Sequence, residues 1–336
     1  MFFSFNSNKM FFSFILFFST LITICANSWF GCWIGLEINL ISFIPLISNN
    51  KNLTSNEASL KYFLTQSIAS INFLFVILLK MFFMKNFFFN NIFLILINCS
   101  LLMKMGSTPF HFWFPNIVDG LSWFNNFILM SWQKISPMIL LSYCFNKTFL
   151  ILIMILNSII GALGSFNQTS LRKIMAFSSI NNLSWMIFAL MISDILWMFY
   201  FIFYSFFIGT LFILFNMSNT FFINQMFTLN LNSLIKFTFM INLLSLGGLP
   251  PFMGFFPKWM IINYLMINNY YIISFLLIMM SLIMLFIYIR IFYSSFMLNY
   301  MKMKWFKINF KNNYNYIYFL NFISILGMIL STFFFL

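Results

Sequence analysis

The sequence predicts an all-α polytopic membrane protein with about eleven transmembrane helices. Of its 336 residues, 62% are hydrophobic and only 6% are charged, whereas a soluble domain carries about 25% charged residues. The apolar residues form runs of about 20, which is the length of one membrane span. Two of these runs are interrupted by the same short motif of glycine and proline. Composition, run length and motif therefore agree on this fold class.

Long apolar runs place the spans, with boundaries good to a few residues. The spans are expected at residues 9–26, 28–48, 58–82, 87–105, 122–145, 148–165, 172–193, 195–217, 233–248, 271–297 and 316–335. The first has no charged segment followed by a small-residue cleavage site, which predicts a retained helix. We expect a single transmembrane domain over residues 1–336, with a first repeat at about 28–145, a second at about 148–297 and a final helix at about 316–335.

The fourth and ninth spans run into a Gly/Pro segment and then resume, at residues 109–118 and 254–268. Aligned on Gly106 and Gly248, both interruptions read G-x-x-P-F-x-x-x-F-P. The two copies follow the fourth and ninth spans, which are five spans apart, and this odd step means that they enter the membrane from opposite sides. Such a pair is typical of an inverted-topology repeat.

Proline removes a backbone donor and clashes with the preceding turn, so the motif predicts a pair of discontinuous helices. Freed backbone groups at membrane depth persist only where they are buried in protein or line a watery cavity. An ordinary proline kink is the alternative. Lys104 directly before the first break and Lys258 directly after the second favour a functional role.

Four ionisable residues lie within or against apolar segments: Glu37, Lys104, Lys134 and Lys258. A charge at the middle of a bilayer costs roughly 2.5–3.5 kcal/mol on insertion scales, so such residues are rare and indicate an ion or proton path. Lys104 is the candidate partner of Glu37, and the pair would act as a proton-responsive switch. A static ion pair that fixes helix packing is the alternative.

About a dozen residues of the apolar span lie on either side of Lys134. Its ammonium is therefore too deep to reach the membrane interface easily. An amine held away from water can exchange protons near neutrality, and Pro137 can loosen the helix for water. The alternative for Lys258 is an interfacial lysine. His111 is a possible relay, although a single histidine on an apolar face is more often a packing residue.

Other polar residues are less informative. Glu57, Asp119 and Asp194 lie near loops and are expected in solvent. A polar strip in the seventh span either supports water or bonds neighbouring helices, and it comprises Ser178, Ser179, Asn181 and Asn182.

Several classes of function are excluded. One histidine and four cysteines without metal-ligand spacing argue against zinc, haem or iron–sulfur ligation by this chain alone. No GxGxxG or P-loop pattern indicates a nucleotide site. The net charge of +13 does not indicate nucleic acid, because the basic residues are scattered singly between apolar runs. One local cluster is interpreted as a positive-inside anchor, and it comprises Lys302, Lys304, Lys307 and Lys311.

The basic residues also predict orientation. More of them fall on the side that holds the N-terminus, so this side should face the compartment where the protein is made. They are Lys9, Lys51, Lys61, Arg172, Lys173, Lys236 and the four lysines of the cluster, against Lys80 or Lys85 and Lys147 on the other side. An odd number of spans then places the C-terminus on the opposite face.

Seven sequence blocks occur in an order that resembles one known family. They are residues 27–29 (NSW), 35–39 (GLEIN), 57–66 (EASLKYFLTQ), 109–113 (PFHFW), 132–134 (WQK), 167–173 (NQTSLRK) and 246–251 (LGGLPP). From about residue 20 to 295, the chain resembles the antiporter-like membrane subunits of respiratory complex I of animal mitochondria, in an arthropod version. This family is related to Mrp-type cation/proton antiporters.

The resemblance implies proton pumping in the mitochondrial inner membrane, coupled to NADH oxidation by ubiquinone elsewhere in the complex. It places Glu37, Lys104, Lys134 and Lys258 on a central hydrophilic axis. It implies no redox chemistry and no cofactor on this chain, since FMN, iron–sulfur clusters and ubiquinone are bound by other subunits. The implied partners are other membrane subunits, accessory subunits and phospholipids such as cardiolipin, with the N-terminus on the matrix side and the C-terminus towards the intermembrane space. Animal members have eleven helices, three fewer than longer relatives.

At one point the chain departs from the family. Members usually have His where Asn182 stands and Gly where Ser184 stands, and an amide carries no proton at physiological pH. A relay through this position would need water or another residue. Two other functions stay open, a stand-alone cation/proton antiporter and a purely structural scaffold. Glu37 is the only deep carboxylate, whereas hard cations prefer several oxygen ligands.

Overall fold

The structure is a computed structural model that describes residues 7–49, 52–83, 90–228 and 233–297, together with 322 and 325. Over these residues the fold is helical, and the only pairing of extended backbone is an isolated bridge between Ser170 and Phe222. The predicted all-α class is confirmed. The chain divides into two compact units, Met1–Ile153 and Met154–Leu336.

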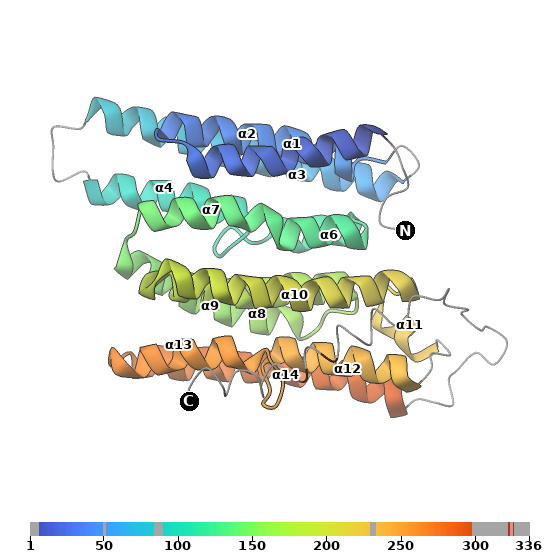
Figure 1. Cartoon of the computed structure of the whole chain (residues 1–336). Coiled ribbons are helices and arrows are strands. Elements are labelled where there is room, and N and C mark those ends of the chain that lie inside the picture. Colours follow the sequence, from blue (N-terminus) through green and yellow to red (C-terminus); the bar gives the residue numbers. More distant parts are fainter. Residues whose placement is uncertain are drawn as a thin grey trace. The chain divides into compact units, whose positions relative to one another are not determined.

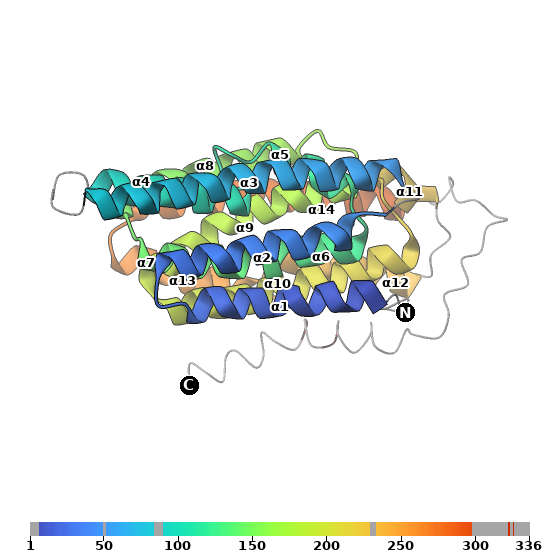
Figure 2. The ribbon, with the colours of Figure 1, turned by 90° about the horizontal axis from the view of Figure 1, so that it is seen from above.

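The first unit is built from antiparallel helices, coloured blue to green in Figure 1. They are α1 (Ser7–Cys25), α2 (Trp29–Ile47), α3 (Leu53–Phe82), α4 (Asn90–Met105), α5 (Trp113–Gly120), α6 (Trp123–Met130) and α7 (Trp132–Tyr143). The turn into α2 is capped by the Ser28 hydroxyl, which accepts a hydrogen bond from the Gly31 amide at 3.2 Å. α1 lies alongside α2 in Figures 1 and 2, and a Cβ on Gly35 would come within 2.5 Å of Thr23. The missing side chain therefore permits this close packing.

The second unit contains the remaining helices, coloured green to orange-red in Figure 1. They are α8 (Lys147–Ser165), which begins in the first unit, α9 (Leu171–Ile192), α10 (Asp194–Ser218), α11 (Ile223–Thr228), α12 (Ser233–Gly247), α13 (Phe255–Ile267) and α14 (Tyr271–Met297). α9 is the most buried of the candidate membrane spans in the described residues, with 89% of its most apolar 18-residue stretch buried. The predicted polar strip therefore lies in the protein interior.

Both predicted helix interruptions are present. In the first unit α4 ends at Met105, directly before Gly106, whose φ of +70° favours glycine. The Gly106 amide donates to the Met103 carbonyl at 3.3 Å and the Ser107 amide donates to the Leu102 carbonyl at 3.1 Å. This pair of bonds is a Schellman motif, which satisfies carbonyls that a helix end would leave open. The chain resumes as α5 at Trp113.

The second break repeats this geometry at the matching motif positions. Gly248 has φ +78°, its amide donates to the Ser245 carbonyl at 3.0 Å, and the Leu249 amide donates to the Leu244 carbonyl at 3.3 Å. A cis peptide bond precedes the proline at the fourth motif position in both breaks. The two breaks thus share backbone conformation as well as sequence.

The helix bounds agree with the predicted spans to within a few residues for most helices. Within the described ranges, seven helices are long and apolar enough to cross a membrane, and two shorter apolar helices are Asn91–Met105 and Leu234–Gly247. The expected final helix at 316–335 lies outside the described residues apart from 322 and 325. Of the basic residues used for orientation, Lys51, Lys85, Lys302, Lys304, Lys307 and Lys311 lie outside the described residues. The total of about eleven spans stays a prediction.

One predicted span is wrong in detail. Residues 122–145 were expected as a single helix, but they form α6 and α7, separated at Ser131 with φ −108° and ψ −75°. Pro137 explains the position of the interruption, since a proline ring clashes with the carbonyl four residues earlier, here that of Gln133. The distortion therefore falls one turn or more before the proline.

Candidate functional site

Lys104 lies in the last turn of α4, directly before the first break, and its side chain is 7% exposed. The carbonyl of Lys104 accepts a hydrogen bond from the Gln66 amide of α3 at 3.1 Å. Beside it lies a cavity of ≈ 10 Å³, about the room that one water molecule needs. The lining residues come from four helices and are Leu36, Asn39, Leu40, Tyr62, Gln66, Lys104, Gln133, Ser136 and Pro137. The lysine thus faces a small polar space.

Glu37 lies on α2 and is half-buried, and its neighbours Leu36 and Asn39 line this cavity. The Glu37 carboxylate interacts electrostatically with Lys104. Among the described residues, however, no direct ion pair joins the two side chains. The expected pair is therefore a longer-range interaction, and a static contact ion pair is excluded in this conformation.

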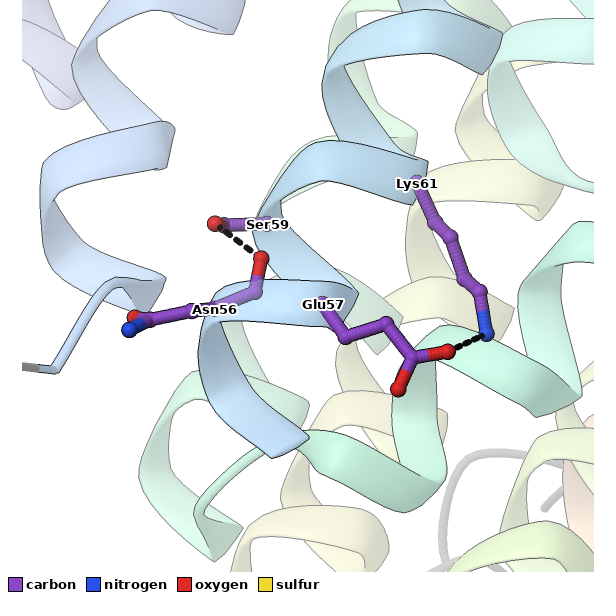
Figure 3. A network of polar contacts seen from close by, with 4 residues as sticks. All are labelled: Asn56, Glu57, Ser59 and Lys61. Atoms are coloured by element: carbon purple, nitrogen blue, oxygen red, sulfur yellow. Dashed lines mark hydrogen bonds and ion pairs between the residues drawn. The ribbon is translucent and has the colours of Figure 1, made fainter. Parts of the chain in front are cut away.

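The direct ion pair that the described part of the chain does contain joins Glu57 and Lys61, one turn apart on α3. Figure 3 shows this pair beside the bond from the Ser59 hydroxyl to the Asn56 carbonyl. Both charged side chains are exposed, at 65% for Glu57 and 48% for Lys61. Exposed pairs of this kind contribute about 0–1 kcal/mol. The prediction that Glu57 lies in solvent is confirmed.

Lys134 is the most deeply buried of the four predicted ionisable residues, with 1% of its side chain exposed. It lies in the first turn of α7, just after the interruption at Ser131. Its Nζ lies 5.5 Å from the ring centroid of Phe114, within the range of a cation–π interaction. A Cβ on Gly106 would meet the Phe114 side chain at 2.8 Å. One ring therefore contacts both the first break and the Lys134 ammonium.

Lys258 lies in the first turn of α13, directly after the second break, and is 7% exposed. Its ammonium donates to the Gly247 carbonyl at 2.8 Å and to the Leu246 carbonyl at 3.4 Å. These carbonyls form the C-terminal end of α12, where the helix dipole is negative. The side chain passes Gly248, where a Cβ would lie 2.8 Å from the Lys258 Cδ. This placement makes Lys258 an inner residue and contradicts the interfacial alternative.

His111 lies in the first break and is 7% exposed. Its ring packs on Phe112, with ring centroids 4.2 Å apart, and interacts with the backbone of Pro109. Its Nδ1 is buried and makes no hydrogen bond within the described structure. These contacts are those of a packing residue, and the relay role stays a prediction.

Sequence reasoning missed several hydrogen bonds between polar residues that line the cavities beside the buried lysines. In the first unit Gln133 donates to the Asn39 side chain at 2.8 Å, which joins α7 to α2. In the second unit the Tyr200 hydroxyl of α10 donates to Asn182 at 3.0 Å. The available signal was a polar residue on the buried face of an apolar helix. Contacts between different helices are not visible from sequence spacing.

The acidic residues near loops only partly match expectation. Asp194 is exposed at the start of α10, as predicted. Asp119 in α5 is half-buried, and its Oδ1 has no solvent contact. The expectation of full solvation for Asp119 is wrong, because α5 packs against α3: a Cβ on Gly120 would lie 2.6 Å from the Thr54 carbonyl.

Comparison with known families decides the relationship. Residues 26–284 match the family described as "NADH:quinone oxidoreductase/Mrp antiporter, TM". The chain belongs to this family. It is 49% identical over 322 residues to NADH-ubiquinone oxidoreductase chain 2 of Anopheles gambiae, covering 94% of each chain. It is 50% identical over 332 residues to the protein of that name in Aedes aegypti, covering 97% of each. The insect relatives agree with the predicted arthropod resemblance.

Solved structures support the same fold for this family member. A chain of respiratory complex I from Thermus thermophilus has a TM-score of 0.83 at 19% identity, covering 96% of this chain and 78% of that one. A chain of the Mrp complex from Dietzia sp. has a TM-score of 0.78 at 13% identity, covering 96% and 75%. The predicted antiporter-like fold is therefore confirmed.

Proposed function

We propose that this chain is a proton-translocating membrane subunit of NADH:ubiquinone oxidoreductase in the mitochondrial inner membrane. The observation that carries the proposal is that each compact unit buries a lysine against a helix break, Lys104 in the first and Lys258 in the second. Relatives named as chain 2 of that enzyme share about half of their residues with this chain over nearly its whole length. Buried ionisable residues in a membrane protein indicate a proton path.

Protons would move along Glu37, Lys104, Lys134 and Lys258, driven by electron transfer in other subunits. Protonation of Glu37 removes the negative charge that acts on Lys104, and so makes the Lys104 ammonium less favourable. A change of charge at Lys104 then alters the stability of the Lys134 ammonium, and through it that of Lys258. The polar cavity beside Lys104 has room for about one water molecule, which would serve as a local proton donor or acceptor for this lysine.

The environment of Lys134 suits an intermediate carrier. Its ammonium is buried and lies against the Phe114 ring, and charges interact more strongly in the protein interior than in water, so its protonation responds to nearby charges. Two backbone carbonyls hold the charged form of Lys258. A proton delivered to Lys258 would therefore be retained until a change of charge at another residue of the path releases it.

The remaining assignments follow from membership in the complex. FMN, iron–sulfur clusters and ubiquinone would be bound by other subunits, and no group of three or more His, Cys, Asp or Glu that could hold a metal occurs in the described ranges. The partners would be other membrane subunits, accessory subunits and phospholipids such as cardiolipin. The N-terminus would face the matrix and the C-terminus the intermembrane space.

A stand-alone cation/proton antiporter is the second candidate, since the family includes Mrp antiporters. The similarity to the Mrp complex is in fold alone, at 13% identity. Reconstitution of the purified chain in liposomes would show exchange of Na⁺ or K⁺ for protons if this candidate holds. A structural scaffold would tolerate apolar replacement of all four charges without loss of coupling.

The first experiment is a native gel of detergent-solubilised source membranes, stained for NADH oxidation and probed for this chain. The proposal predicts that the chain migrates with a very large band that oxidises NADH. Migration alone, or in a small band without that activity, would contradict the proposal and favour the antiporter.

A further inference from the structure

Three tyrosines in the second unit are buried near Lys258 and have no part in the lysine path. Tyr200 and Tyr204 lie one turn apart on α10, and Tyr288 lies on α14. Each is at most 3% exposed. A buried phenol hydroxyl needs a hydrogen-bond partner, so the direction of each bond matters.

Two of these hydroxyls bond to polar side chains of α9, and the third lies close to it. Tyr200 donates to the Asn182 Oδ1 at 3.0 Å, and an amide oxygen can only accept. Tyr204 is hydrogen-bonded to Ser179, and Tyr288 lies beside Ser178. Part of the polar strip of α9 thus binds tyrosine hydroxyls of α10.

Ser179 accepts the bond from Tyr204. The Ser179 hydroxyl donates its own proton to the Ala176 carbonyl at 2.7 Å. A serine has one proton to donate, so its oxygen receives the tyrosine proton. The proton of Tyr204 therefore points to α9 and is turned away from other partners, whereas the phenol oxygen keeps a lone pair.

A cavity of ≈ 10 Å³ separates this set from Lys258, and it is lined by Asn182, Tyr200, Phe203, Tyr204, Phe207, Ser245, Leu246, Gly254, Pro257 and Lys258. Ser245 also donates its proton to a backbone carbonyl, that of Asn242 at 2.8 Å. Tyr200, Tyr204 and Ser245 therefore present acceptor lone pairs to the cavity. Lys258 has three N–H donors, and the bonds to Gly247 and Leu246 use two of them.

We propose that one water molecule occupies this cavity, accepts the third N–H of Lys258, and donates to the phenol oxygens of Tyr200 and Tyr204. The cavity has about the volume that one water requires, and a buried water typically makes about three hydrogen bonds. Tyr200 and Tyr204 are then positioning residues of the water, and Asn182 acts through Tyr200.

This assignment gives a role to Asn182. The amide carries no proton, but its oxygen fixes the Tyr200 hydroxyl so that the phenol oxygen faces the cavity. Proton exchange at Lys258 would then pass through the water. The effect on pumping rests on the proposed function, whereas the water site itself does not.

The test is a structure of the intact complex at a resolution that shows ordered water, for the parent and for the double variant Tyr200→Phe/Tyr204→Phe. The proposal predicts density within hydrogen-bond distance of Lys258 Nζ and both phenol oxygens in the parent, and loss of that density in the variant. Tyr264→Phe is the matched control, because Tyr264 lies on α13 with Lys258 but is 40% exposed. An empty cavity in the parent, or density retained in the double variant, would overturn the proposal.

Proton transfer per NADH is measured on the same samples. The double variant should translocate fewer protons per NADH than the Tyr264→Phe control, and an equal ratio would overturn the positioning role. The two proposals fail separately, since a water seen in a complex whose Lys134 variant pumps normally would contradict only the proposed function.

Discussion

The Lys258 ammonium of α13 donates to the carbonyl of Gly247, the last residue of α12, at 2.8 Å. One side chain therefore closes the helix end across the break that precedes it. A hydrogen bond from a charged donor is roughly twice as strong as a neutral one, so loss of the proton weakens this closure. In the first unit the corresponding helix end is closed by a neutral donor, because Gln66 bonds to the Lys104 carbonyl. The protonation state of Lys258 therefore affects the hydrogen bonding of the helix end at the second break. At the first break the donor is an uncharged amide, so this link is missing there.

Gly248→Ala should destabilise the second break. A Cβ at φ +78° costs about 1–2 kcal/mol, and it would also lie 2.8 Å from the Lys258 Cδ and displace the ammonium from its carbonyls. Gly247→Ala is the control, since its nearest neighbours would be at an ordinary 3.4 Å. Survival of the assembled complex on native gels after graded heating measures the difference. Equal survival of the two variants would contradict this role of Gly248.

Gln66→Leu should loosen the end of α4. The change removes the donor to the Lys104 carbonyl, and an unsatisfied buried acceptor costs about 1–3 kcal/mol. Thr65→Val is the control, because the Thr65 hydroxyl bonds only to carbonyls of its own helix and a change there should stay within about 0.5 kcal/mol. The same heating assay should separate the two variants. If the two variants survive heating equally, the bond from Gln66 to the Lys104 carbonyl does not stabilise the complex.

Glu37→Gln should lower proton translocation while NADH oxidation continues. The amide keeps the shape of the side chain but removes the charge that acts on Lys104. Glu57→Gln removes a charge from the same unit at an exposed ion pair, and it should leave the proton-to-electron ratio unchanged. The ratio is measured in vesicles that contain the intact complex. Equal ratios in both variants would remove Glu37 from the path.

The helices could be predicted from sequence because the physical signals are local. The ends of α9 and α10 match the expected spans, since Ser170 and Ser193 precede their first turns in extended conformation. The two broken helices could also be predicted, because glycine and proline act on the backbone directly. The break at Ser131 lacked such a signal at its own position, since the proline that explains it lies six residues later.

The site could be predicted only in part. The burial of Lys104, Lys134 and Lys258 follows from their place in apolar runs. Their surroundings do not, because the bond between Gln133 and Asn39 and the bond between Tyr200 and Asn182 join helices far apart in sequence. Lys104 was predicted as the partner of Glu37 from sequence alone, and the structure shows an electrostatic interaction between them without a direct ion pair.

The central claim is that a deeply buried lysine carries protons through this subunit, and Lys134→Met tests it most directly. Replacing a buried charge by an apolar side chain of similar size is often neutral or stabilising, so the complex should assemble and oxidise NADH. Lys147→Met, at an exposed position, is the control. We predict fewer protons translocated per NADH in the Lys134 variant than in the control. A normal ratio in an assembled Lys134→Met complex would contradict the claim.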